Sequence, residues 1–296
     1  MSNGESRVNV PDVCANLNEW GRWRNLLIRR QWLIERPAVQ GIRTDLRLRD
    51  DEFAKLPSKA QYKGATELWK ALMKFVVSES LENPADFCFS FGERMNGKFN
   101  QAEIDVAVKH RGIAAVDKVS YKFFSRQRKE VEKNIEELAS QLPVCEWWVS
   151  LVGCASGGLG KIIAETGDLS NYANPDKLKK RLGLSVMKGR APSTWVRAGG
   201  LTKEEWVELG YCPRRRSVMY TIGASIIFVK SPDNRFRLMY EREKEKKIKQ
   251  KEGDEDWPKG RLDLHARRYM EQQLLIELWA RWNGVWKEKG EVLECV

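Results

Sequence analysis

The segment Val116–Leu142 reads VDKVSYKFFSRQRKEVEKNIEELASQL and predicts one long helix. Its apolar side chains recur every three or four residues, which places them on one helical face; they are Val131, Ile135, Leu138 and Leu142. Charged residues fill Arg126–Glu137 in between, a pattern typical of an exposed or coiled-coil-like helix. We therefore expect a mainly α fold in which residues 116–145 form a connecting arm, and a homo-oligomer assembled through helix 116–142.

The region before this arm, residues 1–115, predicts helices and one small β element, without a recognisable role. Apolar residues at helical spacing indicate helices over Leu17–Glu35, which Pro37 is expected to end, and over Ala65–Val77. Aromatic and small residues alternate over Phe87–Phe91, which favours a short strand. The alternation over Ile104–Val108 predicts its partner.

The region after the arm, residues 146–296, begins with a cluster of glycines between two short predicted helices. Such a turn points backbone N–H groups and a helix N-terminus outward and can bind a phosphate, as in the helix-hairpin-helix motif. The alternative is a glycine-rich turn between packed helices, and Ala155 stands where the motif usually has its second glycine. The candidate phosphate-binding residues are Gly153, Gly157, Gly158, Gly160 and Lys161.

The charge of the chain favours a polyanionic partner. The formal net charge is +11, and the positive residues are clustered, which favours nucleic acid over incidental surface lysines. We expect DNA as the partner, with structured RNA as the alternative. The candidate contacts are Lys177, Lys179, Lys180, Arg181, Lys188 and Arg190, followed by Arg214, Arg215 and Arg216.

Several classes of protein are excluded by what the sequence lacks. It has no apolar run of membrane-spanning length and no apolar core of a signal peptide, so a cytoplasmic protein without membrane contact is expected. The six cysteines form no CxxC pair and there are only two histidines, which argues against a zinc site. We expect no cofactor, and magnesium only if an acidic cluster exists in the N-terminal half.

A longer pattern carries a family resemblance. The motif IAETGDLSNY at 163–172 is followed by Pro175, by Lys177-Leu178 and by Gly183-Leu184, and a leucine-rich tail covers His265–Trp279. Together these resemble the C-terminal domain of the bridge-RNA-guided insertion-sequence transposases. That family joins an N-terminal RuvC-like domain with a DEDD acidic set to a C-terminal serine-bearing domain. The resemblance covers roughly residues 120–285 and implies DNA recombination on a mobile element.

The metal-binding half of that family is not recognisable here. A RuvC-like domain needs carboxylates on a central strand to hold two metal ions. The segment Glu103–Val108 has the local pattern of such a strand, but it lies too close to the glycine turn for further strands. The upstream acids Asp45, Asp50, Asp51 and Asp86 are more simply surface charge. We interpret the nuclease-like half as absent or replaced.

The family's nucleophile precedes a helix like Ser217–Val229, in a turn that here reads GYCPRRRS at 210–217. Cys212, Ser217 and Tyr211 are the candidates, and the adjacent arginines would stabilise charge developing on phosphorus. Alternatively Ser217 caps the helix and the arginines only bind phosphate. Three hypotheses follow: a non-catalytic transposase-derived nucleic-acid-binding protein, which we favour; an active DNA transposase or recombinase; and a helical interaction protein that dimerises.

Overall fold

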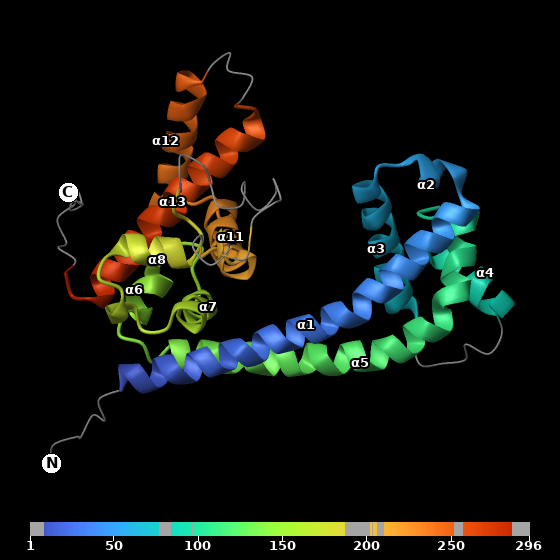
Figure 1. Cartoon of the computed structure of the whole chain (residues 1–296), viewed down its shortest axis with the longest axis horizontal. Coiled ribbons are helices and arrows are strands. Elements are labelled where there is room, and N and C mark those ends of the chain that lie inside the picture. Colours follow the sequence, from blue (N-terminus) through green and yellow to red (C-terminus); the bar gives the residue numbers. More distant parts are fainter. Residues whose placement is uncertain are drawn as a thin grey trace. The chain divides into compact units, whose positions relative to one another are not determined.

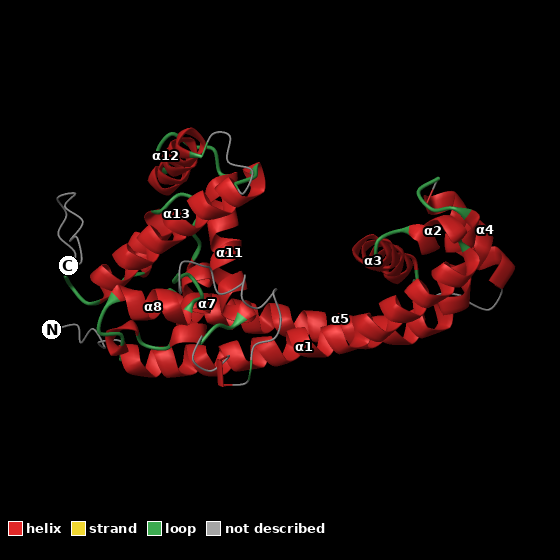
Figure 2. Ribbon diagram, turned by 45° about the horizontal axis from the view of Figure 1, so that its top comes forward, coloured by secondary structure: helices red, strands yellow, loops and turns green. Residues whose placement is uncertain are grey.

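The computed structural model describes residues 9–76, 84–95, 97–186, 202, 204–205, 210–251 and 257–285. Over these residues the chain forms helices and no strand (Figure 2), which confirms the mainly α prediction. The chain divides into two compact units. One consists of Met1–Arg22 with Glu132–Val296, here called the C-terminal unit, and the other is Trp23–Val131, called the middle unit.

The middle unit contains the later part of α1 (Val10–Arg49), then α2 (Asp51–Lys55), α3 (Ser58–Phe75) and α4 (Pro84–Met95), and the first part of α5 (Gln101–Ala139) (Figure 1). These helices enclose one apolar core. Its largest fully buried members are Trp69, Phe91, Ile42, Leu46, Leu68 and Leu72. Burial of this apolar surface is what holds such short helices in place.

The predicted β element is wrong, because Phe87–Phe91 lies in α4 and Ile104–Val108 lies in α5. An aromatic residue at every second position fits a helix when only the first and last are buried. Phe87 and Phe91 stack with ring centroids 5.7 Å apart, whereas Phe89 is 67% exposed. The side chains of Phe75 and Phe99 complete the aromatic cluster. Tertiary packing therefore overrides the alternating pattern.

Two helix boundaries also differ from expectation. Pro37 lies inside α1 and does not end it, even though proline leaves the carbonyl of Leu33 without its N–H donor. The buried residues Ala38, Val39 and Ile42 follow directly and keep the helix on the core. Helix α5 begins at Gln101, 15 residues before the predicted start, because Asn100 and Glu103 form a reciprocal capping box.

The C-terminal unit contains α6 (Cys145–Ser150), α7 (Ser156–Thr166), the 3-10 turn η1 (Leu169–Asn171) and α8 (Pro175–Arg181). It continues with α11 (Pro213–Phe228), α12 (Arg235–Gln250) and α13 (Lys259–Trp282). The highly charged, glycine-containing stretch Arg242–Asp256 has the composition of a flexible insertion, yet its residues up to Gln250 belong to α12. Residues 252–256 lie outside the described residues. The leucine-rich tail His265–Trp279 lies within α13.

The compact units do not follow the predicted segments 1–115, 116–145 and 146–296. Residue 116 lies in the middle of α5, and residue 146 lies inside α6. Part of the apolar stripe of the predicted arm is buried within the fold, because Ile135 is fully buried and Leu142 is only 3% exposed. These two side chains are therefore unavailable for the coiled-coil dimerisation that the sequence suggested.

Candidate nucleic-acid interface

Two basic clusters that are separate in the sequence meet in the C-terminal unit. The end of α8 and the residues that lead into α11 approach closely at two glycines. A Cβ on Gly183 would lie 2.9 Å from the ring of Tyr211 and 3.3 Å from the Cβ of Arg216. Gly183 also has φ +71°, which favours glycine. Lys180 extends its Cε to within 3.8 Å of the corresponding position on Gly210. Residues 177–181 and 214–216 are thus brought to one region.

Helix α8 presents its basic side chains outward because its other face is buried. Asn174 caps the helix, Pro175 starts it, and Pro175 and Leu178 point into the core. Lys177, Lys180 and Arg181 are exposed. Lys179 differs from them because its Nζ lies 2.5 Å from Asp176 and its side chain is only 17% exposed. Of the predicted contacts on this helix, Lys179 is therefore the one already neutralised.

Arg214 and Arg215 share one buried carboxylate, that of Glu165 in the last turn of α7. Arg214 donates two hydrogen bonds to it, from Nε at 2.9 Å and from Nη2 at 3.1 Å, and the Nε of Arg215 lies 3.6 Å away. The Glu165 side chain is 6% exposed, whereas that of Arg214 is 52% exposed. Burial alone would lower the pKa of Arg214, but the ion pair with Glu165 outweighs it and raises the pKa above its ordinary value.

Arg215 lies in an excess of positive charge. Its pKa is lowered, first by burial and then by the nearby guanidinium of Arg181, with a smaller contribution from Arg214. Arg181 and Arg215 both also act on Tyr172, whose pKa is raised by burial and partly restored by these two cations. Three arginines therefore surround one phenol and one carboxylate, and the local charge is positive.

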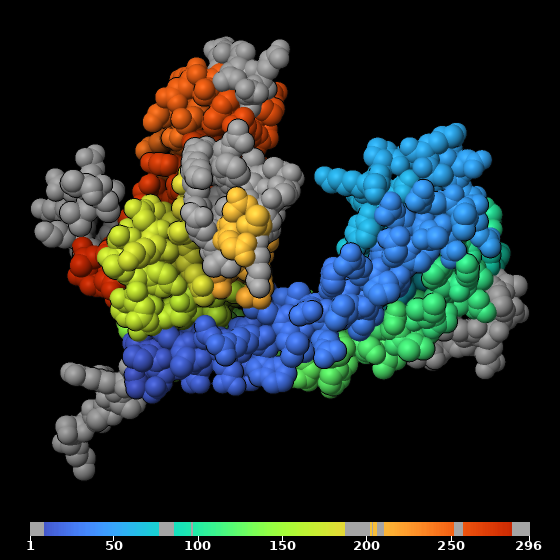
Figure 3. Space-filling view, viewed as in Figure 1, coloured from blue at the N-terminus to red at the C-terminus, as the bar shows by residue number. Residues whose placement is uncertain are grey.

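We name the four cations Lys180, Arg181, Arg214 and Arg215 the α8–α11 surface. On the face drawn in Figure 3, the yellow-green surface of the α7–α8 segment is exposed. The first turn of α11 adds backbone N–H groups, because Cys212 at the N-cap makes no side-chain capping hydrogen bond. This surface combines positive charge with the backbone N–H groups of a helix N-terminus, as phosphate recognition requires.

Arg216 pairs with a different carboxyl group, and its side chain is 13% exposed. Its Nη2 lies 2.8 Å from Glu271 in α13, a carboxyl group that is fully buried. Burial raises the pKa of Glu271 to about 7, against the opposing effect of Arg216, Arg267 and Arg268. Arg216 is therefore the counter-ion of Glu271, and it is not one of the proposed phosphate contacts.

Close packing requires glycine at two of the four positions of the glycine-rich turn. A Cβ on Gly153, which has φ +86°, would lie 2.7 Å from the Cα of Ile226 in α11. On Gly160 it would lie 2.6 Å from the Cγ2 of Ile135 in α5, whereas on Gly158 it would make an ordinary contact of 3.5 Å with Ile222. Only at Gly157, in the first turn of α7, is the space open. The turn matches the alternative of a glycine-rich connection between packed helices.

The turn also lies away from the α8–α11 surface. Gly153 contacts α11 at Ile226, eleven residues after Arg215, which corresponds to about 16 Å along a helix. The sequence suggested one continuous phosphate-binding surface; the structure separates its two halves. Lys161 is half-buried on α7. Lys188 and Arg190 lie outside the described residues.

The three candidate nucleophiles lie at the start of α11, in different surroundings. Cys212 is a free, half-buried thiol beside Arg214 and Arg215. Ser217 is exposed and donates its hydroxyl hydrogen bond to the carbonyl of Arg214 at 3.1 Å, so it does not cap the helix. Tyr211 packs its ring on Gly183. Cys212 is the one that shares a site with both arginines.

Three acidic residues of the middle unit are engaged in helix caps and ion pairs. Asp50 caps α2 and accepts a hydrogen bond from Asn100, and Asp45 pairs with Lys109 and His110, in each case at 2.7 Å. Glu103 belongs to the capping box of α5 and is not part of a strand. Among the described residues, no group of three or more histidine, cysteine or acidic side chains is placed to hold a metal ion.

Sequence reasoning missed the partners that organise this site. Glu165 and Tyr172 stood out only as letters of a motif, and nothing local links Glu165 to arginines 49 residues later. The sequence predicted that the two basic clusters are exposed, but it did not predict which acidic side chains pair with them.

Within the described residues, no helix has the length and apolarity needed to span a bilayer. No family model matches the chain, and no significant match is found among curated proteins or solved structures.

Proposed function

We propose that this protein binds nucleic acid by gripping the sugar-phosphate backbone with the α8–α11 surface, as a transposase-derived protein that does not cut DNA. The observation that carries the proposal is the crowding of Arg181, Arg214 and Arg215, of which Arg214 and Arg215 share the single carboxylate of Glu165 and Arg181 lies close enough to lower the pKa of Arg215. A phosphate placed there would relieve the mutual repulsion of the guanidinium groups and accept their remaining hydrogen bonds.

The transposase part of the proposal is supported by the resemblance of residues 120–285, and by the location of this surface at the turn where the family carries its nucleophile. Backbone contacts of this kind bind all sequences similarly and release counterions, so affinity falls as salt rises. Duplex DNA is the proposed partner. If the protein preferred structured RNA, the proposed binding surface would stay the same and only the identity of the nucleic acid would change.

The test is binding of the full chain to a fluorescent DNA duplex over a range of salt concentrations. The variant Lys180→Gln/Arg181→Gln removes two exposed charges of the surface. The matched control Lys59→Gln/Lys63→Gln removes two exposed charges from α3 in the middle unit. We expect the first variant to weaken binding about tenfold at moderate salt and to lower the salt slope by about two. Equal effects in both variants, or none in either, would refute the surface.

A second candidate function is DNA strand transfer by a nucleophile in the turn 211–217. The observation in its favour is the position of Cys212 next to Arg214 and Arg215, where a pentacovalent phosphorus would be stabilised. No base is found within hydrogen-bond reach of Cys212 among the described residues, which is why binding without cleavage remains our first choice.

A third candidate is self-association through α5 in the middle unit. Four large apolar side chains on this helix are more than half exposed: Ile113 (55%), Val116 (70%), Val119 (72%) and Phe123 (52%). These residues are spaced by three or four positions and lie on the side of α5 away from its buried residues Ala107, His110 and Ala114. The homo-oligomer expected from the sequence would then use this stretch in place of Ile135 and Leu142.

A further inference from the structure

We propose that the exposed face of α1 in the middle unit binds an unpaired DNA strand. This face, which we name the α1 face, consists of six exposed side chains with flat rings, positive charge or apolar surface: Trp23, Arg29, Arg30, Trp32, Leu33 and Arg36. The inference rests on the proposed function only in taking DNA as the partner, because the α8–α11 surface belongs to the other compact unit.

The packing of α1 determines which of its side chains remain available. Its buried side chains recur every four or seven residues, which places them on one side of the helix; they are Leu27, Gln31, Ala38 and Ile42. Successive residues of a helix are rotated by about 100°, so Arg29, Leu33 and Arg36 lie on the opposite side. Trp23 and Trp32 lie at its two edges. The α1 face is therefore the side of the helix that is left to solvent.

The α1 face carries positive charge without a matching carboxylate. Arg29 and Arg30 are exposed, and neither forms an ion pair or a hydrogen bond within the described part of the chain. The one acidic residue between Trp23 and Arg36 is Glu35, which is half-buried. The middle unit as a whole has 21 basic and 14 acidic residues. This charge favours a polyanion as the partner.

The aromatic residues distinguish the α1 face from an ordinary basic surface. Trp23 is 51% exposed and Trp32 is 45% exposed, and among the described residues no other tryptophan is exposed. The Cζ of Arg36 lies 4.7 Å from the centre of the Trp32 ring. An exposed indole with a guanidinium group stacked on it is a flat, positively charged platform, and unpaired bases stack on such platforms.

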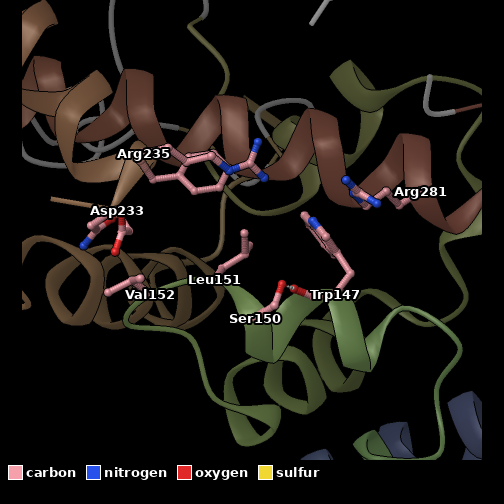
Figure 4. Close-up of a pocket in the computed structure, with 9 residues that line it drawn as sticks. Trp147, Ser150, Leu151, Val152, Asp233, Arg235 and Arg281 are labelled. Atoms are coloured by element: carbon pink, nitrogen blue, oxygen red, sulfur yellow. Dashed lines mark hydrogen bonds between the residues drawn. The ribbon is translucent and has the colours of Figure 1, made fainter. Parts of the chain in front are cut away.

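A second arginine-covered tryptophan shows how such a pair looks when it serves the fold. In the C-terminal unit the Cζ of Arg281 lies 4.8 Å from the ring centre of Trp147, and both side chains line a cleft of about 290 Å³ (Figure 4). There the Nε1 of Trp147 is buried, and Arg281 lies 3.1 Å from the carboxylate of Glu277. Trp32 is exposed instead, and Arg36 has no carboxylate partner within the described ranges.

The spacing of these residues suits one strand that lies along α1. Trp23 and Trp32 are separated by about 14 Å along the helix, and Arg29 and Arg30 lie between them. The two indoles would therefore meet different nucleotides while the arginines meet the phosphates. A duplex keeps its bases paired and stacked on each other, so it would offer this face only phosphates. A second copy of the chain would bring the same arginines against each other.

The test is fluorescence anisotropy of the full chain with labelled oligothymidylate at low salt, beside a duplex with the same number of phosphates. We expect saturable binding of oligothymidylate that weakens as salt rises. Absence of saturable binding would overturn the proposal. Oligouridylate that binds more than about tenfold tighter would overturn the choice of DNA over RNA. Equally strong competition by polyglutamate of the same charge would overturn base stacking, because an acidic polypeptide would then fit the face as well.

A matched pair of variants tests the stacking. Trp23→Leu/Trp32→Leu keeps apolar bulk and removes both flat rings, and it should weaken oligothymidylate binding about tenfold or more while leaving duplex binding within about twofold. The control Tyr62→Leu/Phe89→Leu makes a similar change at exposed aromatic residues of α3 and α4 and should leave both affinities unaltered. Equal effects of the two variants, or an equal loss of duplex binding, would contradict the stacking role.

A charge variant makes the test independent of the rings. Arg29→Gln/Arg30→Gln should lower the salt slope of oligothymidylate binding by about 1.4, as expected for two phosphate contacts with a single strand, whereas Lys59→Gln/Lys63→Gln should leave it unchanged. An unchanged slope in the arginine variant would exclude the α1 face.

The two DNA-binding surfaces can fail separately. Lys180→Gln/Arg181→Gln should weaken duplex binding and keep oligothymidylate affinity within about twofold, whereas Trp23→Leu/Trp32→Leu should do the reverse. If the first variant leaves duplex binding intact, the α8–α11 surface is refuted. If the second leaves oligothymidylate binding intact, the α1 face is refuted. A dimer in the absence of DNA that the tryptophan variant converts to monomer would assign the α1 face to a second copy and overturn the proposal.

Discussion

Arg214 in the first turn of α11 holds Glu165 in the last turn of α7 by two hydrogen bonds, of 2.9 and 3.1 Å. The pair joins two helices and at the same time fixes the cations of the α8–α11 surface. One carboxylate therefore determines both the stability of this region and its charge, and the two roles can be separated by mutation.

Replacement of Glu165 by glutamine should destabilise the protein and should not weaken nucleic-acid binding of the folded fraction. Loss of the carboxylate leaves Arg215, whose side chain is 19% exposed, without its counter-ion, at a cost of about 3 kcal/mol. Urea denaturation measures this cost. The control Glu137→Gln removes one half of an exposed pair with Lys133 and should change stability by less than about 0.5 kcal/mol. A similar loss in both variants would contradict this role of Glu165.

Alanine at Gly160 and at Gly157 should have opposite effects, although the two glycines are three residues apart. At Gly160 a Cβ would lie 2.8 Å from the backbone oxygen of Ile135, which cannot move aside, so we expect a loss of about 1–3 kcal/mol. At Gly157 the space is open, and alanine in a helix should stabilise by up to about 1 kcal/mol. Thermal unfolding compares them. Reduced DNA binding by Gly157→Ala would support the hypothesis that the glycine-rich turn binds phosphate.

The burial of Glu271 should make stability fall as the pH rises from about 4.5 to 7. Burial raises the pKa of this carboxyl group from 4.5 to about 7, so in this window the folded protein binds a proton that the unfolded chain has lost. The linked loss is at most about 3 kcal/mol. We expect Glu271→Gln to remove this slope, so that its stability relative to the parent protein increases between pH 5 and pH 8. Parallel pH profiles would contradict the assignment.

The parent protein should form no covalent adduct with a nicked DNA suicide substrate, because binding without cleavage is the function we propose. Cys212→Ala and Ser217→Ala should accordingly leave duplex affinity within about twofold, since neither side chain is among the four cations of the surface. Gel electrophoresis under denaturing conditions detects an adduct. An adduct that disappears in one of these variants would establish strand transfer and identify its nucleophile.

Self-association through α5 should become stronger with salt. Lys122 and Arg126 are exposed beside the apolar residues Val119 and Phe123, so two copies repel until the charges are screened. Sedimentation velocity should then show a dimer at high salt that Val116→Lys/Val119→Lys converts to monomer. This salt dependence has the opposite sign to that of nucleic-acid binding. A parent protein that is monomeric at every salt concentration would remove the third candidate.

The sequence by itself determined the helical class, the existence of the long helix found as α5 (Gln101–Ala139), and the location of the basic clusters. These are local properties, because periodicity, capping residues and charge runs act within a few turns of the chain. It failed at Pro37 and at Phe87–Phe91, where burial in the core outweighs local preference.

Only the tertiary structure decided which basic side chains face solvent and which pair with buried carboxyl groups. Arg214 and Arg216 are two residues apart, yet one is half exposed and the other is paired with a carboxyl group in α13. The difference depends on Glu165 and Glu271, which lie about fifty residues away on either side. An ion pair of that sequence separation leaves no periodic signal, because it depends on how α7 and α13 pack around α11 and not on the chain next to it.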